Sequence, residues 1–324
     1  MQNIVPKSPV FLRLKFRWIA LCLLFIIFGT SVEGHSKNPA KLLANIAASD
    51  DDYDPYCIEQ RTRAYLRRDL ARTTKKRERE EKEKVYEFLK ENPVQVFPYD
   101  FVKTYDRDNI QVYTDDSCDM LYVLHESKRL YFPSEYCEHT VRHIYVSLLI
   151  EQDINSPHRY EYGNFRVKEG DVVVDVGSAE GNFALSVVER AKKIYLFEPE
   201  EEWTPALEKT FEPWRDKVVI VRKYVSDTTT ETEVRLDDYF EGMNIHFLKI
   251  DVEGAELQVL QGGEKLLANQ RKLQVVVCAY HKPHDEDIIN DWLQARRFRT
   301  HFSNGYMIFE APWLRRGLIR ATKR

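Results

Sequence analysis

Cysteine is scarce in this sequence and is not arranged in a metal-binding pattern. The chain has no C-x-x-C pair and no spacing typical of a zinc site. The odd number of cysteines argues against a complete disulfide framework and is ordinary for a reducing compartment. Pairing of Cys118 with Cys137 stays open if the chain is exported. The five cysteines are Cys22, Cys57, Cys118, Cys137 and Cys278.

The strong basic excess of a dedicated nucleic-acid-binding protein is also missing. The formal net charge is −4, so we expect no nucleic-acid partner. Residues 1–90 carry 18 Lys and Arg against 12 Asp and Glu, whereas residues 91–324 carry 30 against 40. The 43% of hydrophobic residues can form a substantial core, which excludes global disorder. A small basic cluster ends the chain, with Arg315, Arg316, Arg320, Lys323 and Arg324.

The N-terminal apolar run is too short for a comfortable membrane span. It extends from Trp18 to Phe28, about eleven residues, whereas a spanning helix needs roughly 20. Basic residues precede the run, as in a secretory signal peptide, and Val32 and Gly34 would suit cleavage. A membrane-surface anchor and an upstream extension are the alternatives. Residues 1–34 are therefore predicted to be a signal- or anchor-like segment.

Two further regions precede the main α/β pattern. Residues 35–93 are predicted to be a linker followed by a charged, exposed helix over 61–91, because opposite charges recur there four residues apart. Residues 94–165 are rich in Tyr, Phe and His and are predicted to form a small α+β cap with a helix over 138–151. Its short strands are expected at Gln111–Tyr113, Leu121–Leu124 and Arg129–Phe132. The charge pairs are Lys76–Glu80, Arg77–Glu81 and Glu78–Lys82.

From residue 166 strand and helix patterns alternate, which predicts a parallel sheet with helices on both faces. Right-handed crossovers then bring the carboxyl ends of all parallel strands to one edge, where ligands bind. Strands are expected over 171–176, 193–197, 217–222, 245–250 and 273–279, and helices near 181–191, 202–212, 254–268 and 284–296.

The first strand of this pattern leads into a glycine turn, in the stretch VVVDVGSAEGNF. Asp175 closes the strand, and Gly177 and Gly181 follow with D-x-G-x-x-x-G spacing, which differs from the dinucleotide fingerprint G-x-G-x-x-G. A strand, glycine turn and helix allow backbone N–H groups to approach a nucleotide-like ligand. Glycine after a strand is also common in turns that have no binding role.

The next two strand ends supply candidate nucleoside contacts. Glu198 lies 23 positions after Asp175, a spacing that suits hydrogen bonds to two ribose hydroxyls. It could also be a carboxylate at a helix N-terminus. The third strand leads into Ser226 and Asp227, which are placed to edge an adenine ring.

The fourth and fifth strand ends carry the candidate reaction centre. Lys249 and Asp251 share one face of the fourth strand, and Glu253 and Glu256 open the next helix. Three acids and a lysine exceed what helix capping requires. The fifth strand runs into His281, a candidate general base because imidazole titrates near neutrality, although a structural histidine is the alternative.

The end of the chain predicts an antiparallel hairpin. Phe298–Phe302 and Tyr306–Glu310 alternate in polarity about Asn304-Gly305, a two-residue hairpin signal. A hairpin that closes an otherwise parallel sheet is expected for methyltransferases that use S-adenosylmethionine, and not for a plain dinucleotide-binding sheet. Residues 313–324 are then predicted to be a basic tail.

Taken together, four segments resemble the FkbM family of methyltransferases. They are VVVDVGSAEGNFAL, IYLFEPE, VRLDDYF and FLKIDVEGAELQVLQGGEKLL, and the upstream LLIEQDINSPHRY resembles the lead-in of bacterial members. The resemblance covers roughly residues 165–312. It implies a Rossmann-like class I methyltransferase fold, with a mainly parallel seven-stranded sheet and a terminal antiparallel hairpin. The methyltransferase domain is placed at residues 166–312.

The resemblance also implies S-adenosyl-L-methionine as the cofactor. Asp175 and the two glycines would surround its methionine and ribose portions, Glu198 would hold the ribose, and Asp251 would lie beside the reacting methyl. The family pattern Ala-Asn-x is replaced here by Ser178-Ala179-Glu180, so Glu180 could face the cofactor's ammonium or cap the helix. The predicted cofactor-binding residues are Asp175, Gly177, Ser178, Glu180, Gly181, Glu198, Ser226 and Asp227.

The predicted reaction is methylation of a hydroxyl oxygen on a glycan or small molecule. His281 or Asp251 would remove the proton, while Lys249 and Glu253 orient the partners. A divalent metal on Asp251 and Glu253 is conceivable, but the sequence offers no complete ligand set and we predict no metal. The alternatives are a nicotinamide-dependent oxidoreductase and a non-catalytic, membrane-associated cofactor-binding protein. The predicted catalytic residues are Asp251, His281, Lys249 and Glu253.

The expected location follows from the cofactor. S-adenosylmethionine is a cytosolic metabolite, so we expect a cytoplasmic catalytic domain, with membrane association through residues 11–32 and the basic C-terminus. The positive-inside rule argues the other way, because it would place the residues after an inserted segment outside the cell. Export therefore stays open, and the oligomeric state is not predicted.

Overall fold

The computed structural model describes residues 55–323. The segment predicted at residues 1–34, including the anchor at 11–32, lies outside the described residues, as does most of the predicted linker. Among the residues described, no helix combines the length and the apolar character needed to cross a membrane. Cys118 and Cys137 form no disulfide with each other.

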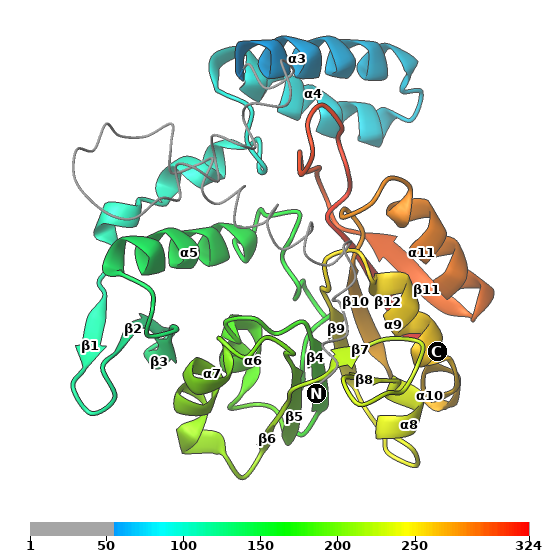
Figure 1. The fold of residues 1–324 in the computed structure, drawn as a ribbon. Coiled ribbons are helices and arrows are strands. Elements are labelled where there is room, and N and C mark those ends of the chain that lie inside the picture. The colour runs from blue at the N-terminus through cyan, green and yellow to red at the C-terminus, as the bar shows by residue number, and fades with distance from the viewer. Residues whose placement is uncertain (1–54, 324) are drawn as a thin grey trace, which may run out of the picture. The chain divides into compact units, whose positions relative to one another are not determined.

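A seven-stranded sheet forms the centre of the fold, with strand order β11-β12-β10-β9-β4-β5-β6 (Figure 1). The strands from β10 to β6 are parallel, whereas β12 runs antiparallel to both of its neighbours. This confirms the predicted class I methyltransferase fold. The strands are β4 (Val172–Val176), β5 (Lys193–Phe197), β6 (Val218–Val221), β9 (Phe247–Ile250), β10 (Gln274–Cys278), β11 (Phe298–Phe302) and β12 (Leu318–Lys323).

Helices cover both faces of the sheet, because the central strands bury side chains on both sides. In β4, Val173 belongs to one core cluster, and Val174 and Val176 belong to the other. By this alternation Asp175 lies on the Val173 side of the sheet. The first cluster includes residues of α5 (Glu138–Glu151), α6 (Asn182–Val187) and α7 (Thr204–Thr210), and the second includes residues of α8 (Leu236–Tyr239), α9 (Glu256–Gly262), α10 (Glu264–Asn269) and α11 (Asp285–Ala295).

The predicted two-residue hairpin is wrong, because β11 pairs with β12 and not with residues 306–310. Gly305 does adopt a left-handed φ of +85°. However, the backbone N–H of Tyr306 donates to the Tyr99 hydroxyl, and that of Ile308 donates to the carbonyl of Val96. Tyr306 and Ile308 are buried there in a separate apolar cluster. Packing against residues 96–99 therefore replaces pairing with β11.

The predicted basic tail at 313–324 is also wrong, because residues 318–323 form β12 inside the sheet. Ile319 and Ala321 are fully buried. Arg320 donates to the backbone oxygen of Tyr160, and Lys323 donates to the carbonyls of Leu267 and Ala268. The cationic groups of β12 therefore bond within the fold, which removes them from the predicted basic surface.

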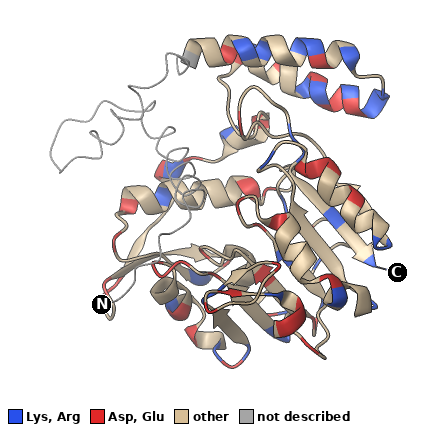
Figure 2. Ribbon diagram, turned by 45° about the vertical axis from the view of Figure 1, so that its right-hand side comes forward, with Lys and Arg blue, Asp and Glu red and all other residues tan. Residues whose placement is uncertain are grey.

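The charged stretch at 61–91 forms two helices, α3 (Pro55–Arg72) and α4 (Lys76–Glu91), separated by residues 73–75. Acidic and basic residues alternate along both helices (Figure 2). The three predicted ion pairs are present, but one face is buried. Lys82 lies inside that face and contacts Asp69 at 2.8 Å and Glu78 at 3.0 Å. A buried lysine bridge and apolar packing of Leu66 and Leu89 thus hold the helices together.

The remaining elements form the predicted small α+β region before β4 and the connections of the sheet. The cap helix α5 has its predicted bounds, and a three-stranded antiparallel sheet precedes it. The predicted helix at 254–268 is divided into α9 and α10 at Gly263. The other elements are β1 (Tyr113–Asp115), β2 (Met120–His125), β3 (Lys128–Tyr131), β7 (Tyr224–Val225), β8 (Glu233–Val234), and the 3-10 helices η1 (Asp100–Thr104), η2 (Arg107–Asn109) and η3 (Glu212–Trp214).

Candidate active site

The glycine turn after β4 is closed by its own hydrogen bonds. The N–H groups of Gly177 and Ser178 both donate to the carbonyl of Phe197, at 2.9 and 3.2 Å. The N–H of Ala179 donates to Oε2 of Glu198 at 2.9 Å, and that of Gly181 donates to the carbonyl of Ser178 at 2.7 Å. These N–H groups already donate hydrogen bonds within the fold. They are therefore not free to bind a ligand as predicted.

Gly177 is required by a close backbone approach at the sheet edge. Its φ is +74°, and a Cβ atom there would lie 1.9 Å from the carbonyl oxygen of Asp251. A methyl group cannot fit at that distance. The glycine thus allows the ends of β4 and β9 to meet, which brings the turn beside the acids that follow β9.

Asp175 and Lys249 form a buried ion pair beneath this turn. They are partners in the parallel register of β4 and β9, and Nζ of Lys249 lies 3.0 Å from Oδ1 of Asp175. The same ammonium donates to the carbonyl of Gly177 at 2.6 Å. Burial lowers the pKa of Lys249, but Asp175 and Asp251 more than offset this and raise it. Lys249 is therefore a fixed cation.

Asp251, directly after β9, is held from the cap region. The hydroxyl of Tyr160 donates to its Oδ2 at 2.7 Å, and Nε2 of His158 lies 3.8 Å from the same oxygen. Although burial raises the pKa of Asp251, Lys249 and these neighbours lower it to about 2. Asp251 is thus ionised at neutral pH. His158 is almost fully buried, which lowers its pKa to about 4 and keeps its ring neutral.

His281, after β10, is brought into the same cluster. Its Nδ1 lies 2.8 Å from Oε1 of Glu256, and its Nε2 lies 3.6 Å from Oδ1 of Asp251 and 3.8 Å from Oε2 of Glu253. Burial lowers the pKa of His281, but the carboxylates, Glu256 foremost, raise it to about 9. The ring is therefore an imidazolium at neutral pH and cannot take up the predicted proton.

Glu253 lies at the exposed side of this cluster. Its φ is +56°, in the left-handed region that is strained for a side-chain-bearing residue. Its side chain is 46% exposed. Burial and the nearby acids raise its pKa, while His281 lowers it, and solvent limits the size of that shift.

Two further carboxyl groups make the region strongly acidic. Glu180, in the glycine turn, is 6% exposed, and burial followed by the charges of Glu198 and Asp251 raises its pKa to about 7. Glu151, at the end of α5, has a pKa raised by burial and by Asp251 and Glu180. A cluster of carboxyl groups with raised pKa values favours binding of a cation, because the cation would stabilise their ionised forms.

Glu198, at the end of β5, is held by backbone N–H groups. Its Oε2 accepts from Ala179 and its Oε1 accepts from Glu200, both at 2.9 Å. A carboxylate has about four acceptor positions, so two remain after these bonds. The side chain is 6% exposed, and its burial raises its pKa. It is fixed in place and can still accept hydrogen bonds from two hydroxyl groups.

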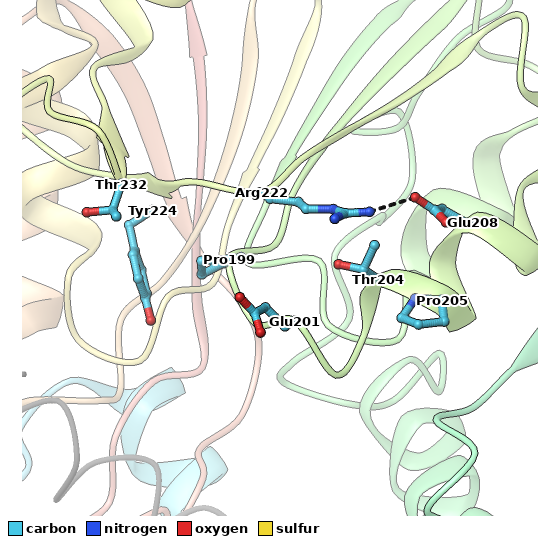
Figure 3. Close-up of a pocket in the computed structure, with 8 residues that line it drawn as sticks. All are labelled: Pro199, Glu201, Thr204, Pro205, Glu208, Arg222, Tyr224 and Thr232. Atoms are coloured by element: carbon cyan, nitrogen blue, oxygen red, sulfur yellow. Dashed lines mark hydrogen bonds and ion pairs between the residues drawn. The ribbon is translucent and has the colours of Figure 1, made fainter. Parts of the chain in front are cut away.

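The predicted adenine contacts lie in a separate turn. Oγ of Ser226 accepts from the backbone N–H of Thr228 at 3.1 Å, and Asp227 is exposed. Their contact with a nucleobase stays a prediction. A cleft of about 420 Å³ opens beside Glu198, between the residues after β5 and those after β6 (Figure 3). Its walls are Pro199, Glu201, Thr204, Pro205, Glu208, Arg222, Tyr224 and Thr232.

Most of the residues in this cluster were predicted from sequence, but two that contact Asp251 were not. Tyr160 and His158 reach Asp251 from the segment before β4, for which the resemblance implied no site residue. The Tyr280 hydroxyl lies 3.0 Å from Nε2 of His158. Cys278 also points to this side of the sheet, with Sγ 3.6 Å from that nitrogen. Strand alternation from Lys249 could have placed Cys278, but nothing local predicted His158.

Part of the sequence matches a model of a known protein family. Residues 176–300 match the family model described as methyltransferase FkbM domain. No curated protein matches the sequence. A methyltransferase FkbM of Methylobacillus flagellatus is similar in structure, with a TM-score of 0.43 and 17% identity over 57% of this chain and 53% of that one. The match thus spans about half the length of that protein.

Two further solved structures are similar over about half of this chain. TrmK of M. capricolum, in complex with S-adenosyl-homocysteine, has a TM-score of 0.35 and 11% identity over 49% of this chain and 64% of that one. A precorrin-6y C5,15-methyltransferase of Geobacter metallireducens has a TM-score of 0.36 and 12% identity over 49% and 84%. The sequence match over residues 176–300 therefore supports a methyltransferase domain similar to those of the FkbM family.

Proposed function

We propose that the protein transfers the methyl group of S-adenosyl-L-methionine to a hydroxyl oxygen of a glycan or small molecule. The observation that carries the proposal is the buried acid cluster around Asp251, next to the fixed carboxylate of Glu198. The cofactor bears a sulfonium and an ammonium, and these two cations suit a site with this excess of carboxyl groups. The family of residues 176–300 supports the same reaction class.

Glu198 is proposed to bind the ribose. Its two remaining acceptor positions match the two ribose hydroxyls, and the bonds from Ala179 and Glu200 fix its orientation. The adjoining cleft, which Pro199 begins and Tyr224 borders, is a suitable place for the base. Glu180, whose pKa is raised to about 7 mainly by burial, is proposed to meet the cofactor's ammonium. Ionisation of Glu180 would then strengthen that contact.

Asp251 is proposed to orient the acceptor and receive its proton. Of the two predicted bases, Asp251 is the one that is ionised and free of a proton at neutral pH. The acceptor oxygen would form the C–O bond while the C–S electron pair returns to sulfur, and the hydroxyl proton would leave to Asp251 and then to solvent. Because the sulfonium is already activated, alignment and exclusion of water are the main tasks of the protein. Tyr160 fixes Asp251 for this task.

The closed glycine turn argues against the nicotinamide alternative. A pyrophosphate would need free N–H groups at this turn, but those of Gly177, Ser178 and Gly181 already donate to carbonyls. A ribose and a methionine moiety can bind through side chains and need no such cradle. The turn therefore supports the methyltransferase over the oxidoreductase.

A labelled-methyl assay tests the proposal. The full chain is incubated with S-adenosyl-L-methionine labelled in its methyl group and with a panel of glycans and small alcohols, without nucleic acid. We expect label in a base-stable ether on at least one acceptor, and at least a 100-fold lower rate with Asp251→Asn. Label found only on nitrogen, or equal rates for both proteins, would contradict the proposal.

A further inference from the structure

His281 carries a buried ring nitrogen that has no hydrogen-bond partner in the described part of the chain. This atom is Nε2, and the side chain is only 3% exposed. Nε2 lies 3.6 Å from Oδ1 of Asp251 and 3.8 Å from Oε2 of Glu253, and both distances are too long for hydrogen bonds. A buried polar atom without a partner is costly. Its position next to the proposed reaction centre therefore indicates that a ligand supplies the partner.

Glu256 makes Nε2 of His281 a donor. Oε1 of Glu256 accepts from the N–H groups of Val252 and Gly254, each at 3.2 Å, and this oxygen lies 2.8 Å from Nδ1 of His281. The pKa of the ring is raised to about 9, chiefly by Glu256 among its neighbours. In an imidazolium both ring nitrogens carry a proton. One N–H is thus directed at Glu256, and the other faces the proposed reaction centre.

The two carboxylates beside Nε2 differ in their access to solvent. The Tyr160 hydroxyl donates to Oδ2 of Asp251 at 2.7 Å, and Oδ1 is the oxygen that faces His281. The side chain of Asp251 is 17% exposed, whereas that of Glu253 is 46% exposed. A ligand can therefore enter past Glu253 and reach Asp251. On this path it meets one N–H donor between two acceptor oxygens.

An acceptor, donor and acceptor in this order fit two neighbouring hydroxyl groups. A hydroxyl donates one proton and can also accept a hydrogen bond. A single hydroxyl can pair with the N–H of His281 and with one carboxylate, but the other carboxylate then has no partner. A second hydroxyl on the adjacent carbon supplies the missing proton. An anionic ligand would be repelled by both carboxylates, and a cationic ligand would be repelled by the imidazolium.

We propose that the methyl acceptor is a vicinal diol, held by hydrogen bonds to Asp251 and Glu253 and by one from Nε2 of His281. This inference rests on the proposed function and narrows its acceptor class. The hydroxyl at Asp251 forms the new C–O bond while the C–S electron pair returns to sulfur, and its proton leaves to Asp251 and then to solvent. The second hydroxyl donates to Glu253, accepts from His281 and keeps its proton. The product is a monomethyl ether.

Two isomeric diols test the site in the native chain. The full chain is mixed with S-adenosyl-homocysteine, and the binding of cis-1,2-cyclohexanediol and of trans-1,4-cyclohexanediol is measured by saturation-transfer NMR titration. The isomers have the same atoms and the same ring, but only the first has adjacent hydroxyls. We expect it to bind about 10-fold more tightly, because the other isomer leaves a buried polar group without a partner.

Variants connect the preference to the named residues. Glu253→Gln and His281→Asn should each bring the two affinities to within about twofold of each other, because each change removes a contact to the second hydroxyl. Glu253→Gln keeps the size of an exposed side chain, so its fold should be intact. Glu212→Gln, on η3, alters a carboxylate that pairs with Lys209, and it should keep the preference of the native chain.

Three results would overturn the diol site. They are equal affinities of the two isomers for the native chain, no binding of either isomer, and a preference that is unchanged in both Glu253→Gln and His281→Asn. The labelled-methyl assay separates this proposal from the proposed function. Transfer of label to an alcohol together with equal affinities overturns only the diol site. A preference for adjacent hydroxyls that needs Glu253 and His281 supports the diol site even if no methyl group is transferred.

Discussion

Asp175 and Lys249 lie opposite each other in the register of β4 and β9, and their charged groups meet at 3.0 Å with both side chains at most 5% exposed. The pair is a structural support of the site. Lys249 also donates a hydrogen bond to the carbonyl of Gly177, so the ion pair holds the glycine turn in position. The predicted contact of Asp175 with the cofactor is therefore better described as indirect.

Breaking this pair should cost much of the stability of the protein. Asp175→Ala leaves a buried ammonium without its nearest carboxylate, and we expect a loss of about 3 to 5 kcal/mol in the free energy of unfolding. The double variant Asp175→Asn with Lys249→Met should lose less than the sum of the two single changes, because no uncompensated charge remains. Urea unfolding of the four proteins measures both. A cost below about 1 kcal/mol for Asp175→Ala would show that the pair does not support the turn.

The contact between Gly177 and Asp251 can be tested against a matched glycine. Gly177→Ala would place Cβ 1.9 Å from the carbonyl of Asp251, whereas Gly170→Ala has a similar positive φ, +82°, and no atom within 4 Å. Both variants carry backbone strain of roughly 1 kcal/mol. We expect only Gly177→Ala to lose several kcal/mol more, measured as a fall in melting temperature. Equal melting temperatures would mean that the two strand ends do not meet as described.

The parallel strands could be predicted from sequence because they are short buried runs rich in Val, Ile, Leu and Phe, and because β4, β5 and β9 are followed by a glycine or an acid. The last strand could not. Leu318–Lys323 contains Arg320 and Lys323, which look like surface residues until their partners, the carbonyls of Tyr160, Leu267 and Ala268, are known. The hairpin predicted about Asn304-Gly305 was wrong for a related reason. Packing of Tyr306 against residues distant in sequence overrode the local turn signal.

The site, like the sheet, could be predicted from sequence only in part. Lys249, Asp251 and Glu253 share a short motif, so their proximity follows from chain connectivity alone. His158 and Tyr160 reach Asp251 from about 91 positions away, judged by the separation of the Tyr160 bond, and no local pattern encodes such a contact. The charge state of His281 could not be predicted from sequence either, because it depends on carboxylates that only the fold brings close to the ring.

The role of β12 predicts which substitutions near the C-terminus are costly. Ile319 is fully buried and pairs with both Val277 and Phe302. Ile319→Ala should therefore cost about 2 to 5 kcal/mol in the free energy of unfolding. Arg299→Ala, on the exposed side of β11, should stay within roughly 0.5 kcal/mol of the native protein. Denaturant titration compares them, and equal values would restore the basic-tail interpretation.

Glu180 should make both stability and cofactor binding depend on pH. Its pKa in the folded protein is raised from 4.5 to about 7, chiefly by burial. In the absence of a ligand, the contribution of Glu180 to the free energy of unfolding should therefore be largest below pH 4.5. That contribution, roughly 3 kcal/mol, should be lost as the pH rises through 7. Glu180→Gln should remove that part of the slope.

Binding of a cation should favour ionised Glu180. The increase in melting temperature caused by S-adenosyl-L-methionine should thus be larger at pH 8 than at pH 6 in the native protein. In Glu180→Gln the two increases should be similar. Thermal unfolding with and without cofactor measures this, and an increase that is larger at pH 6 would place Glu180 away from the ammonium.

The most direct test of the central claim is isothermal titration of the full chain with S-adenosyl-homocysteine and, separately, with NAD. The account predicts one nucleoside bound per chain, at least 10-fold weaker binding in Glu198→Gln, unchanged binding in Glu212→Gln, and no binding of NAD. Glu198→Gln keeps the shape of the side chain but replaces one of the two acceptor oxygens with an NH₂ donor. Tight binding of NAD without binding of S-adenosyl-homocysteine would contradict the account.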